Sequence, residues 1–279
     1  MITKDKSFYK TFFSLFRMLV IQNIIVLSVN LADNVMIGSY SEAALSGVAA
    51  VNQIQFVYNL FITSLGDAMV VLGSQYWGKG DTKSIKKIAS GALISGVIFG
   101  VLLFGAATFF PEKIIGLFTK TPEIIEQGTQ YIGIIKYTYL LFALTNLFLA
   151  ILRSVEKVRI AFWTSLMSLI INCSINYCLI SGNFGFPEMG VKGAAIGTLT
   201  ARAVELAVVI IYVLFFEKRL HLRVSEILRP DRVYFKDYII TCLPFAVVWV
   251  DAFIPSVIVC ISATASLFED FRKGCKQLE

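Results

Sequence analysis

Long apolar runs separated by short polar stretches dominate this chain. Residues 43–66, 88–110 and 160–187 contain no Asp, Glu, Lys or Arg. A helix that crosses a bilayer needs about 20 predominantly apolar residues. Backbone in hydrocarbon must satisfy its own hydrogen bonds, and the runs lack the period-two alternation of a membrane barrel. The pattern therefore predicts an all-α, polytopic transmembrane helix bundle.

The apolar runs predict about seven membrane-spanning helices, at residues 12–37, 48–76, 87–110, 124–152, 159–181, 192–216 and 237–262. Residues 1–216 would then form a six-helix lobe, and residues 217–236 a basic linker loop. The seventh helix, 237–262, would begin a second lobe. A short charged tail, 263–279, follows it and does not fit the pattern.

Composition supports lipid as the solvent of this protein. Charged residues make up 16% of the 279 residues, against about 25% in a typical soluble domain. The mean hydropathy is +0.74. So little charge leaves too little polar surface to face water, and we expect a protein integral to the cell membrane, with the lipid bilayer as its main partner.

The positive charges are gathered in alternate loops. The net charge is +6, and Lys and Arg concentrate before residue 12 and within 79–87, 153–159 and 217–236, whereas the intervening loops carry few. Cytoplasmic loops are enriched in Lys and Arg, so the alternation predicts a cytoplasmic N-terminus. Topology thus explains the basic character, and nucleic acid is not expected as a partner.

Small residues recur every fourth position in two of the predicted helices. Gly96 and Gly100 form one such face, and Gly193 and Gly197 form another that Ala201 continues. Small residues let helix backbones approach closely in lipid, where no hydrophobic force drives helices together. Both faces predict tight helix–helix packing.

One helix start is marked by residue type. Thr121, Pro122 and Glu123 combine an N-capping residue, a proline at the first helical position and an acid at the positive end of the helix dipole. A helix is therefore expected to begin at this point.

Ionisable residues inside predicted spans are costly, so each is a candidate for function. They are Asp33, Asp67, Lys136, Arg202, Glu205 and Asp251. A carboxylate such as Asp33 can carry a proton, because burial favours its neutral form, or can help to coordinate a cation. The alternative is a structural acid that is hydrogen-bonded to neighbouring helices.

Two further pairs share helix faces. Asn172 and Asn176 are four residues apart, and their amide oxygens can accept a hydrogen bond from a protonated acid or coordinate a hard cation. Spacing alone favours interhelical hydrogen bonds for this pair. Arg202 and Glu205, three apart, are expected to pair with each other in a structural or gating role.

Nothing in the sequence indicates an enzyme. The single histidine, His221, lies in a charged loop, and the five cysteines lack metal-ligand spacing. There is no nucleophile–base pair and no phosphate-binding loop. We expect neither an enzymatic activity nor a bound cofactor.

Four ordered motifs resemble the multidrug and toxic compound extrusion (MATE) family of antiporters. These motifs are Asp33-Asn34-Val35-Met36-Ile37-Gly38, Gln75-Tyr76-Trp77-Gly78-Lys79-Gly80-Asp81, Thr121-Pro122-Glu123-Ile124 with Tyr131-Ile132, and Gly193-Ala194-Ala195-Ile196-Gly197-Thr198. The family is built from twelve helices in two six-helix lobes. The resemblance covers about residues 10–260, so the chain is expected to hold one lobe and the first helix of the next.

The resemblance implies alternating access and the export of organic cations or drugs in exchange for protons or sodium ions. It also implies an ion-coupling cluster, in which the family's first-helix aspartate matches Asp33, its fifth-helix asparagine matches Asn172, and its sixth-helix threonine matches Thr198. A sodium ion at Asp33, Asn172, Asn176 and Thr198 would be the one metal to consider. Asn176 stands where some relatives have aspartate, which leaves the coupling ion open between proton and sodium.

Two other functions compete with a drug antiporter. One is a non-transporting remnant or membrane interaction module, because a single lobe cannot move against another. The other is a lipid-linked sugar flippase of similar architecture, for which a more cationic cavity would be expected. The mixed intramembrane acids and bases favour the antiporter over the flippase.

Overall fold

The computed structural model describes residues 6–217, 220 and 231–248, and these are helical apart from short connections. Their elements are α1 (Lys6–Tyr40), α2 (Glu42–Gly78), α3 (Thr82–Phe109), α4 (Pro111–Ile115), α5 (Pro122–Ser154), α6 (Arg159–Ile180), the 3₁₀ turn η1 (Asn183–Gly185), α7 (Val191–Ile211) and the π-helical turn η2 (Tyr212–Phe216). Residues 232–248 are also helical. Six helices in this described part are long and apolar enough to cross a membrane.

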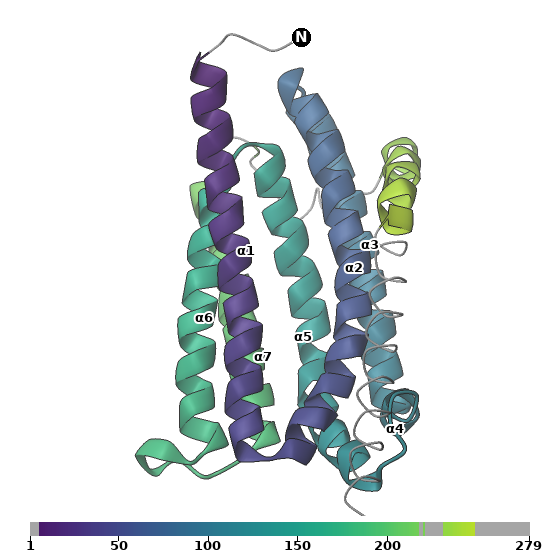
Figure 1. Ribbon diagram of the computed structural model, residues 1–279. Coiled ribbons are helices and arrows are strands. Elements are labelled where there is room, and N and C mark those ends of the chain that lie inside the picture. Colours follow the sequence, from purple (N-terminus) through teal and green to yellow (C-terminus); the bar gives the residue numbers. More distant parts are fainter. Residues whose placement is uncertain (1–5, 218–219, 221–230, 249–279) are drawn as a thin grey trace, which may run out of the picture.

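The long helices run lengthwise beside one another (Figure 1). α5 lies at the centre and packs against α2, α3 and α7, whereas α1 packs mainly against α6. The core around α5 contains fully buried side chains such as Ile132, Tyr139 and Leu147. Many large apolar side chains on the outside are exposed, for example Leu27 on α1 and Leu102 on α3. An apolar exterior over a packed interior is the arrangement expected of an all-α integral membrane protein.

The connection between α1 and α2 is a single residue, Ser41. The sequence predicted a longer loop, with the second helix starting at residue 48. That boundary is wrong because Ser41 acts as the N-cap: its backbone is extended and its side chain accepts a hydrogen bond from the Ala44 N–H at 3.5 Å. Glu42 adds an acid to the first turn.

The predicted start of α5 at Pro122 is confirmed. Thr121 occupies the N-cap position, but its side chain makes no capping hydrogen bond. The backbone N–H of Thr121 instead donates to the Thr119 side chain at 3.2 Å. Before this helix, the chain turns through α4, which begins with Pro111 at its first turn and which the sequence analysis did not anticipate.

Both predicted glycine faces lie at close helix contacts. A Cβ on Gly96 would collide with Leu147 of α5, and one on Gly100 would lie 3.3 Å from the Leu140 Cα. A Cβ on Gly193 would lie 2.7 Å from the Leu179 carbonyl oxygen of α6. Because these glycines have no side chain, the backbone of α3 lies close to α5, and the backbone of α7 lies close to α6.

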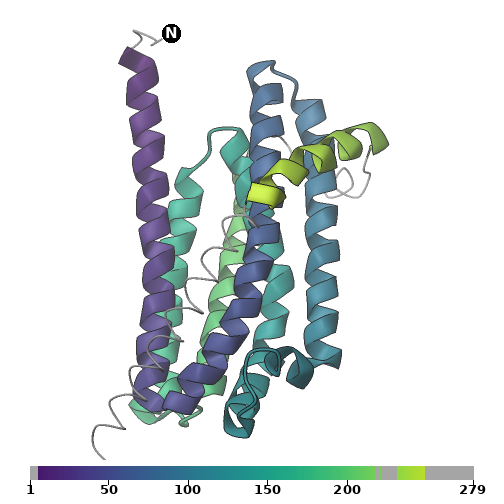
Figure 2. The same ribbon diagram turned by 45° about the vertical axis from the view of Figure 1, so that its right-hand side comes forward.

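The described start of the predicted seventh span is helical, but it begins at residue 232 rather than 237, so the expected loop 217–236 is shorter at this end. This helix crosses α2 and α3 obliquely, near the end of the bundle where α1 begins (Figure 2). Tyr238 is fully buried, and its hydroxyl donates to the Leu65 carbonyl oxygen of α2 at 2.7 Å. Residues 249–279, with Asp251, lie outside the described residues, so the full span and the tail stay predictions.

Polar contacts fasten the beginning of this helix to α3. Lys87 Nζ lies 2.9 Å from Asp231 Oδ2, and the Tyr234 hydroxyl lies 2.9 Å from Ser84 Oγ. The Lys87 hydrogen bond lowers the pKa of the exposed Asp231 carboxyl. At the same end, hydrogen bonds from the Ser84 side chain and backbone lower the pKa of Asp81, the N-cap of α3.

Candidate functional site

The fold joins Asp33 of α1 to Asn176 of α6 by a short hydrogen bond. Asn176 Nδ2 donates to Asp33 Oδ1 at 2.6 Å. Asn176 is completely buried, whereas Asp33 is partly buried. α1 packs mainly on α6, so this polar bond lies within the main contact of α1 with the rest of the bundle.

The hydrogen bonds continue from α6 to α7. The same Asn176 nitrogen lies 3.3 Å from Asn172 Oδ1, and Asn172 Nδ2 donates to Thr198 Oγ1 at 3.3 Å. The four residues that the resemblance singles out thus form one continuous chain across three helices. We refer to Asp33, Asn172, Asn176 and Thr198 as the Asp33 cluster.

A glycine on α7 makes room for this arrangement. A Cβ on Gly197 would collide with the amide oxygen of Asn176. That oxygen is buried and has no hydrogen-bond partner among the described residues. The absence of a side chain at Gly197 therefore leaves room for the Asn176 amide oxygen beside α7, while the amide nitrogen donates to Asp33.

Arg202 and Glu205 pair as the spacing predicted, with Arg202 Nη1 2.8 Å from Glu205 Oε2. Glu205 is buried, and the Arg202 guanidinium lies over the Phe142 ring of α5, 5.1 Å from its centroid. Arg202 is four residues after Thr198, so the two share a face of α7. The pair is therefore next to the Asp33 cluster rather than separate from it.

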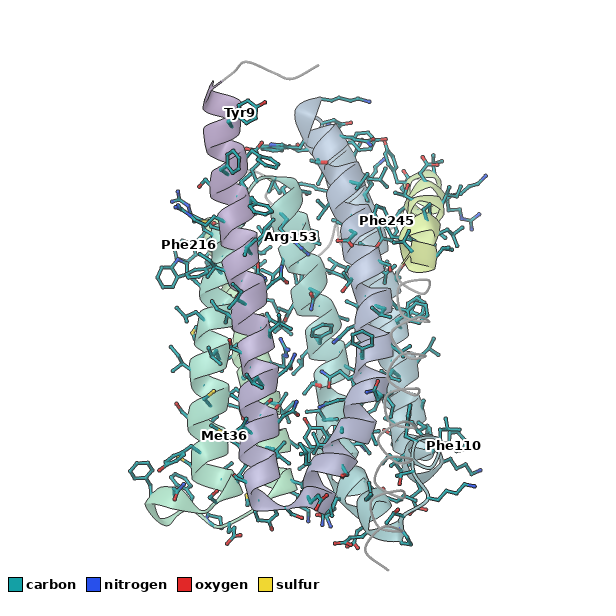
Figure 3. All side chains as sticks on the ribbon, viewed as in Figure 1. Tyr9, Met36, Phe110, Arg153, Phe216 and Phe245 are labelled. Atoms are coloured by element: carbon teal, nitrogen blue, oxygen red, sulfur yellow. The ribbon has the colours of Figure 1, made fainter. Side chains whose placement is uncertain are left out.

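Two other candidates lie elsewhere. Asp67 of α2 interacts electrostatically with Arg153 of α5. Figure 3 shows Arg153 well above Met36, which is three residues from Asp33 on α1. Lys136 lies over the rings of Phe104 and Tyr137, on the α3 side of α5. The structure does not bring these residues into the Asp33 cluster.

Two aromatic residues of α5 were not assigned to the site from sequence. Tyr131 is buried and lies within hydrogen-bonding distance of the Thr198 side chain. It is also close enough to Asp33 for an electrostatic interaction. Phe142 supports Arg202. In the sequence, Tyr131 stood out only as part of the motif that follows Thr121, and Phe142 was one aromatic residue among many. The contact of α5 with α7 places both of them here.

This arrangement gathers side chains that can bind a proton or a cation. It combines one carboxylate, two amides and a hydroxyl inside a bundle of helices that can span a membrane. Such groups can share a proton with the carboxyl or contribute oxygens to a cation. Fold and cluster together define an α-helical integral membrane protein with a polar cluster between three of its helices.

Sequence comparison places this membrane protein in a family. The family model MatE matches residues 19–178, more than half of the chain, and the chain belongs to that family. A probable multidrug resistance protein NorM from Thermotoga maritima is 29% identical over 203 residues, which is 72% of this chain and 43% of that protein. The uncharacterized transporter YisQ of Bacillus subtilis is 24% identical, over 79% of this chain and 48% of that protein.

Solved structures share the fold. A multidrug resistance MATE family transporter in an outward-facing conformation matches with a TM-score of 0.77 at 19% identity, over 88% of this chain and 53% of that chain. A MOP superfamily transporter from Pyrococcus furiosus gives the same values. The chain spans less than half of the length of the curated relatives described above.

Proposed function

We propose that this chain provides one lobe of a secondary antiporter that exports drugs or organic cations in exchange for protons or sodium ions by alternating access. In this proposal residues 1–216 form the lobe, the linker predicted at 217–236 lies on the cytoplasmic side, and the helix that the structure describes from residue 232 leads into the second lobe. A cytoplasmic N-terminus is part of the proposal and rests on the basic loops. The multidrug names of relatives such as the Thermotoga maritima protein support the substrate class.

The observation that carries the proposal is the hydrogen-bonded Asp33 cluster. A lone carboxylate between membrane helices is expensive to keep charged unless it is compensated. Here the buried Asn176 amide stabilises the charged form of Asp33 through a bond of 2.6 Å. Binding and release of an ion at Asp33 changes this bond, and with it the contact between α1 and α6.

The test is efflux of a fluorescent organic cation from proteoliposomes that contain the chain together with the C-terminal lobe of a relative, driven by a pH gradient or by a sodium gradient. Asp33→Asn keeps the side-chain shape and removes the ionisable group, so we expect gradient-driven efflux to be lost. Asp67→Asn is the matched control, because Asp67 is also an acid within a span but lies with Arg153, away from the cluster. Unchanged efflux by Asp33→Asn would remove Asp33 from the mechanism.

A second candidate function is a membrane module that does not transport by itself. The observation in its favour is that the chain spans less than half of the length of its curated relatives. If the correctly inserted chain shows no efflux alone but does so with the C-terminal lobe of a relative, the antiporter proposal holds with that lobe as partner. No efflux in either case favours the module.

A further inference from the structure

The helix formed by residues 232–248 has two faces of different chemistry. One face lies against the bundle: Tyr238 and Cys242 are buried, and Tyr234 and Phe245 pack against the core. Hydrogen bonds from this face reach the Leu65 carbonyl oxygen on α2 and the side chain of Ser84 on α3. The opposite face of the helix is therefore turned away from the bundle.

The outward face carries a single stripe of exposed side chains. The stripe consists of Arg232, Lys236, Ile240, Leu243 and Val247, all of which are exposed. Their spacing of three or four residues places them in line along the helix. Two cations come first and three apolar side chains follow. We refer to these five residues as the 232–247 stripe.

The acids nearest to the two cations have other partners or point elsewhere. Asp231 pairs with Lys87 at 2.9 Å, and Asp81 caps the start of α3. Asp237 is the one acid among residues 232–248. Because it directly follows Lys236, it projects about 100° away from that lysine around the helix axis. The stripe therefore keeps a positive beginning.

The order of side chains along the stripe matches an anionic phospholipid, which joins a charged phosphate to hydrocarbon chains. With a rise of 1.5 Å per residue, Leu243 lies about 10 Å beyond Lys236 along the helix. A phosphate at the cations thus leaves the acyl chains beside the apolar part. Lys and Arg side chains are long enough to reach polar headgroups while their stems remain on apolar surface. Inorganic phosphate would use only the first part of the stripe.

We propose that the 232–247 stripe binds an anionic phospholipid, with the phosphate at Arg232 and Lys236 and the acyl chains along the three apolar residues. The lipid lies where this helix crosses α2 and α3, near the end of the bundle where α1 begins (Figure 2). Anionic membrane surfaces attract basic segments of this kind. The inference is independent of Asp33 and of transport, so it can fail without the proposed function failing.

The test compares two lipids that differ in charge. Native mass spectrometry is applied to the purified chain after its release from micelles with equal amounts of phosphatidylglycerol and phosphatidylcholine. We expect the wild type to retain phosphatidylglycerol preferentially. Arg232→Gln with Lys236→Gln should lower this preference at least about tenfold, because each basic residue near an anionic membrane surface contributes about fivefold to binding. Arg232→Lys with Lys236→Arg keeps both charges and should keep the preference.

Two controls separate the stripe from a basic surface in general and a lipid from a free phosphate. Lys79→Gln with Lys83→Gln removes two exposed cations from the same end of the bundle and should leave most of the preference. Glycerol phosphate has the anionic group without acyl chains, so it should not displace phosphatidylglycerol.

Four results would overturn the inference. The wild type could retain the two lipids equally, or Arg232→Gln with Lys236→Gln could keep the preference for phosphatidylglycerol. An equal loss of preference in Lys79→Gln with Lys83→Gln would show a diffuse basic surface in place of the stripe. Displacement of the lipid by glycerol phosphate would show a phosphate site that does not recognise acyl chains.

Discussion

The Asp33 cluster and the Lys87–Asp231 contact use similar bonds in opposite surroundings. The bond from Asn176 to Asp33 is 2.6 Å long, and the ion pair of Lys87 and Asp231 is 2.9 Å long. Asn176 is fully buried, whereas the Lys87 and Asp231 side chains are 46% and 33% exposed. Exposed pairs are screened by water and contribute little, but a buried polar group that loses its partner is costly. Bond length therefore says less about importance than burial does.

The largest effect on stability is expected from Gly197→Ala, which disturbs the buried Asp33 cluster. The added Cβ collides with the Asn176 amide, which must move and give up its bonds to Asp33 and Asn172. We expect a loss of about 2–4 kcal/mol in the free energy of unfolding, from overpacking and unpaired buried groups. Denaturant unfolding in mixed micelles measures it.

Gly133→Ala is the matched control, since it is also a helical glycine and a Cβ there meets nothing within 4 Å. It should be neutral or slightly stabilising, because alanine favours helix over glycine. Equal losses in the two variants would show that the Asn176 contact with α7 is not a tight one.

An intermediate effect is expected where the helix 232–248 meets α2. Tyr238→Phe removes the buried hydroxyl that donates to the Leu65 carbonyl, at a cost of about 1 kcal/mol. The same unfolding assay measures this loss. Tyr177→Phe serves as the control, because Tyr177 is 53% exposed. The free energy of unfolding of this variant should stay close to that of the wild type. A loss no larger than that of the control would mean that this helix is not held at Leu65.

The smallest effect on stability is expected at the exposed Lys87–Asp231 pair. The pKa of Asp231 is lowered in the folded protein, so the stability contributed by its pair with Lys87 is present above the ordinary carboxyl pKa. It is lost as the pH falls through the lowered value. Asp231→Asn should remove this acid-dependent part and weaken the salt dependence, while Asp237→Asn, an exposed acid on the same helix, should not. Hydrogen exchange of residues 232–248 against pH distinguishes the two variants, and identical pH profiles would count against the pair.

The sequence predicted the helices well and their junctions poorly. Apolar length located the six long spans of the described residues, and Pro122 marked the start of α5. The turn at Ser41 was missed because an apolar run does not show where one helix ends and the next begins, whereas the cap does. The oblique path of the helix from 232 depends on contacts with Leu65 and Ser84, more than 140 residues earlier in the chain.

The sequence predicted which side chains pair within one helix, but not how side chains are oriented between helices. Three-residue spacing was enough to pair Arg202 with Glu205. The position of the Arg202 guanidinium over the Phe142 ring follows from the rotation of α7 against α5, which spacing does not encode. The same holds for the Asn176 amide, whose direction is set by Gly197 on another helix.

The single residue between α1 and α2 has a consequence for how the protein enters a bilayer. The two helices contain 35 and 37 residues, so they form a hairpin with arms of nearly equal length. Polar groups are costly to carry through hydrocarbon, and here the tip of the hairpin adds little beyond Ser41 and Glu42. The two helices can therefore insert into the bilayer as one unit, because few polar residues at the tip of the hairpin have to cross the hydrocarbon.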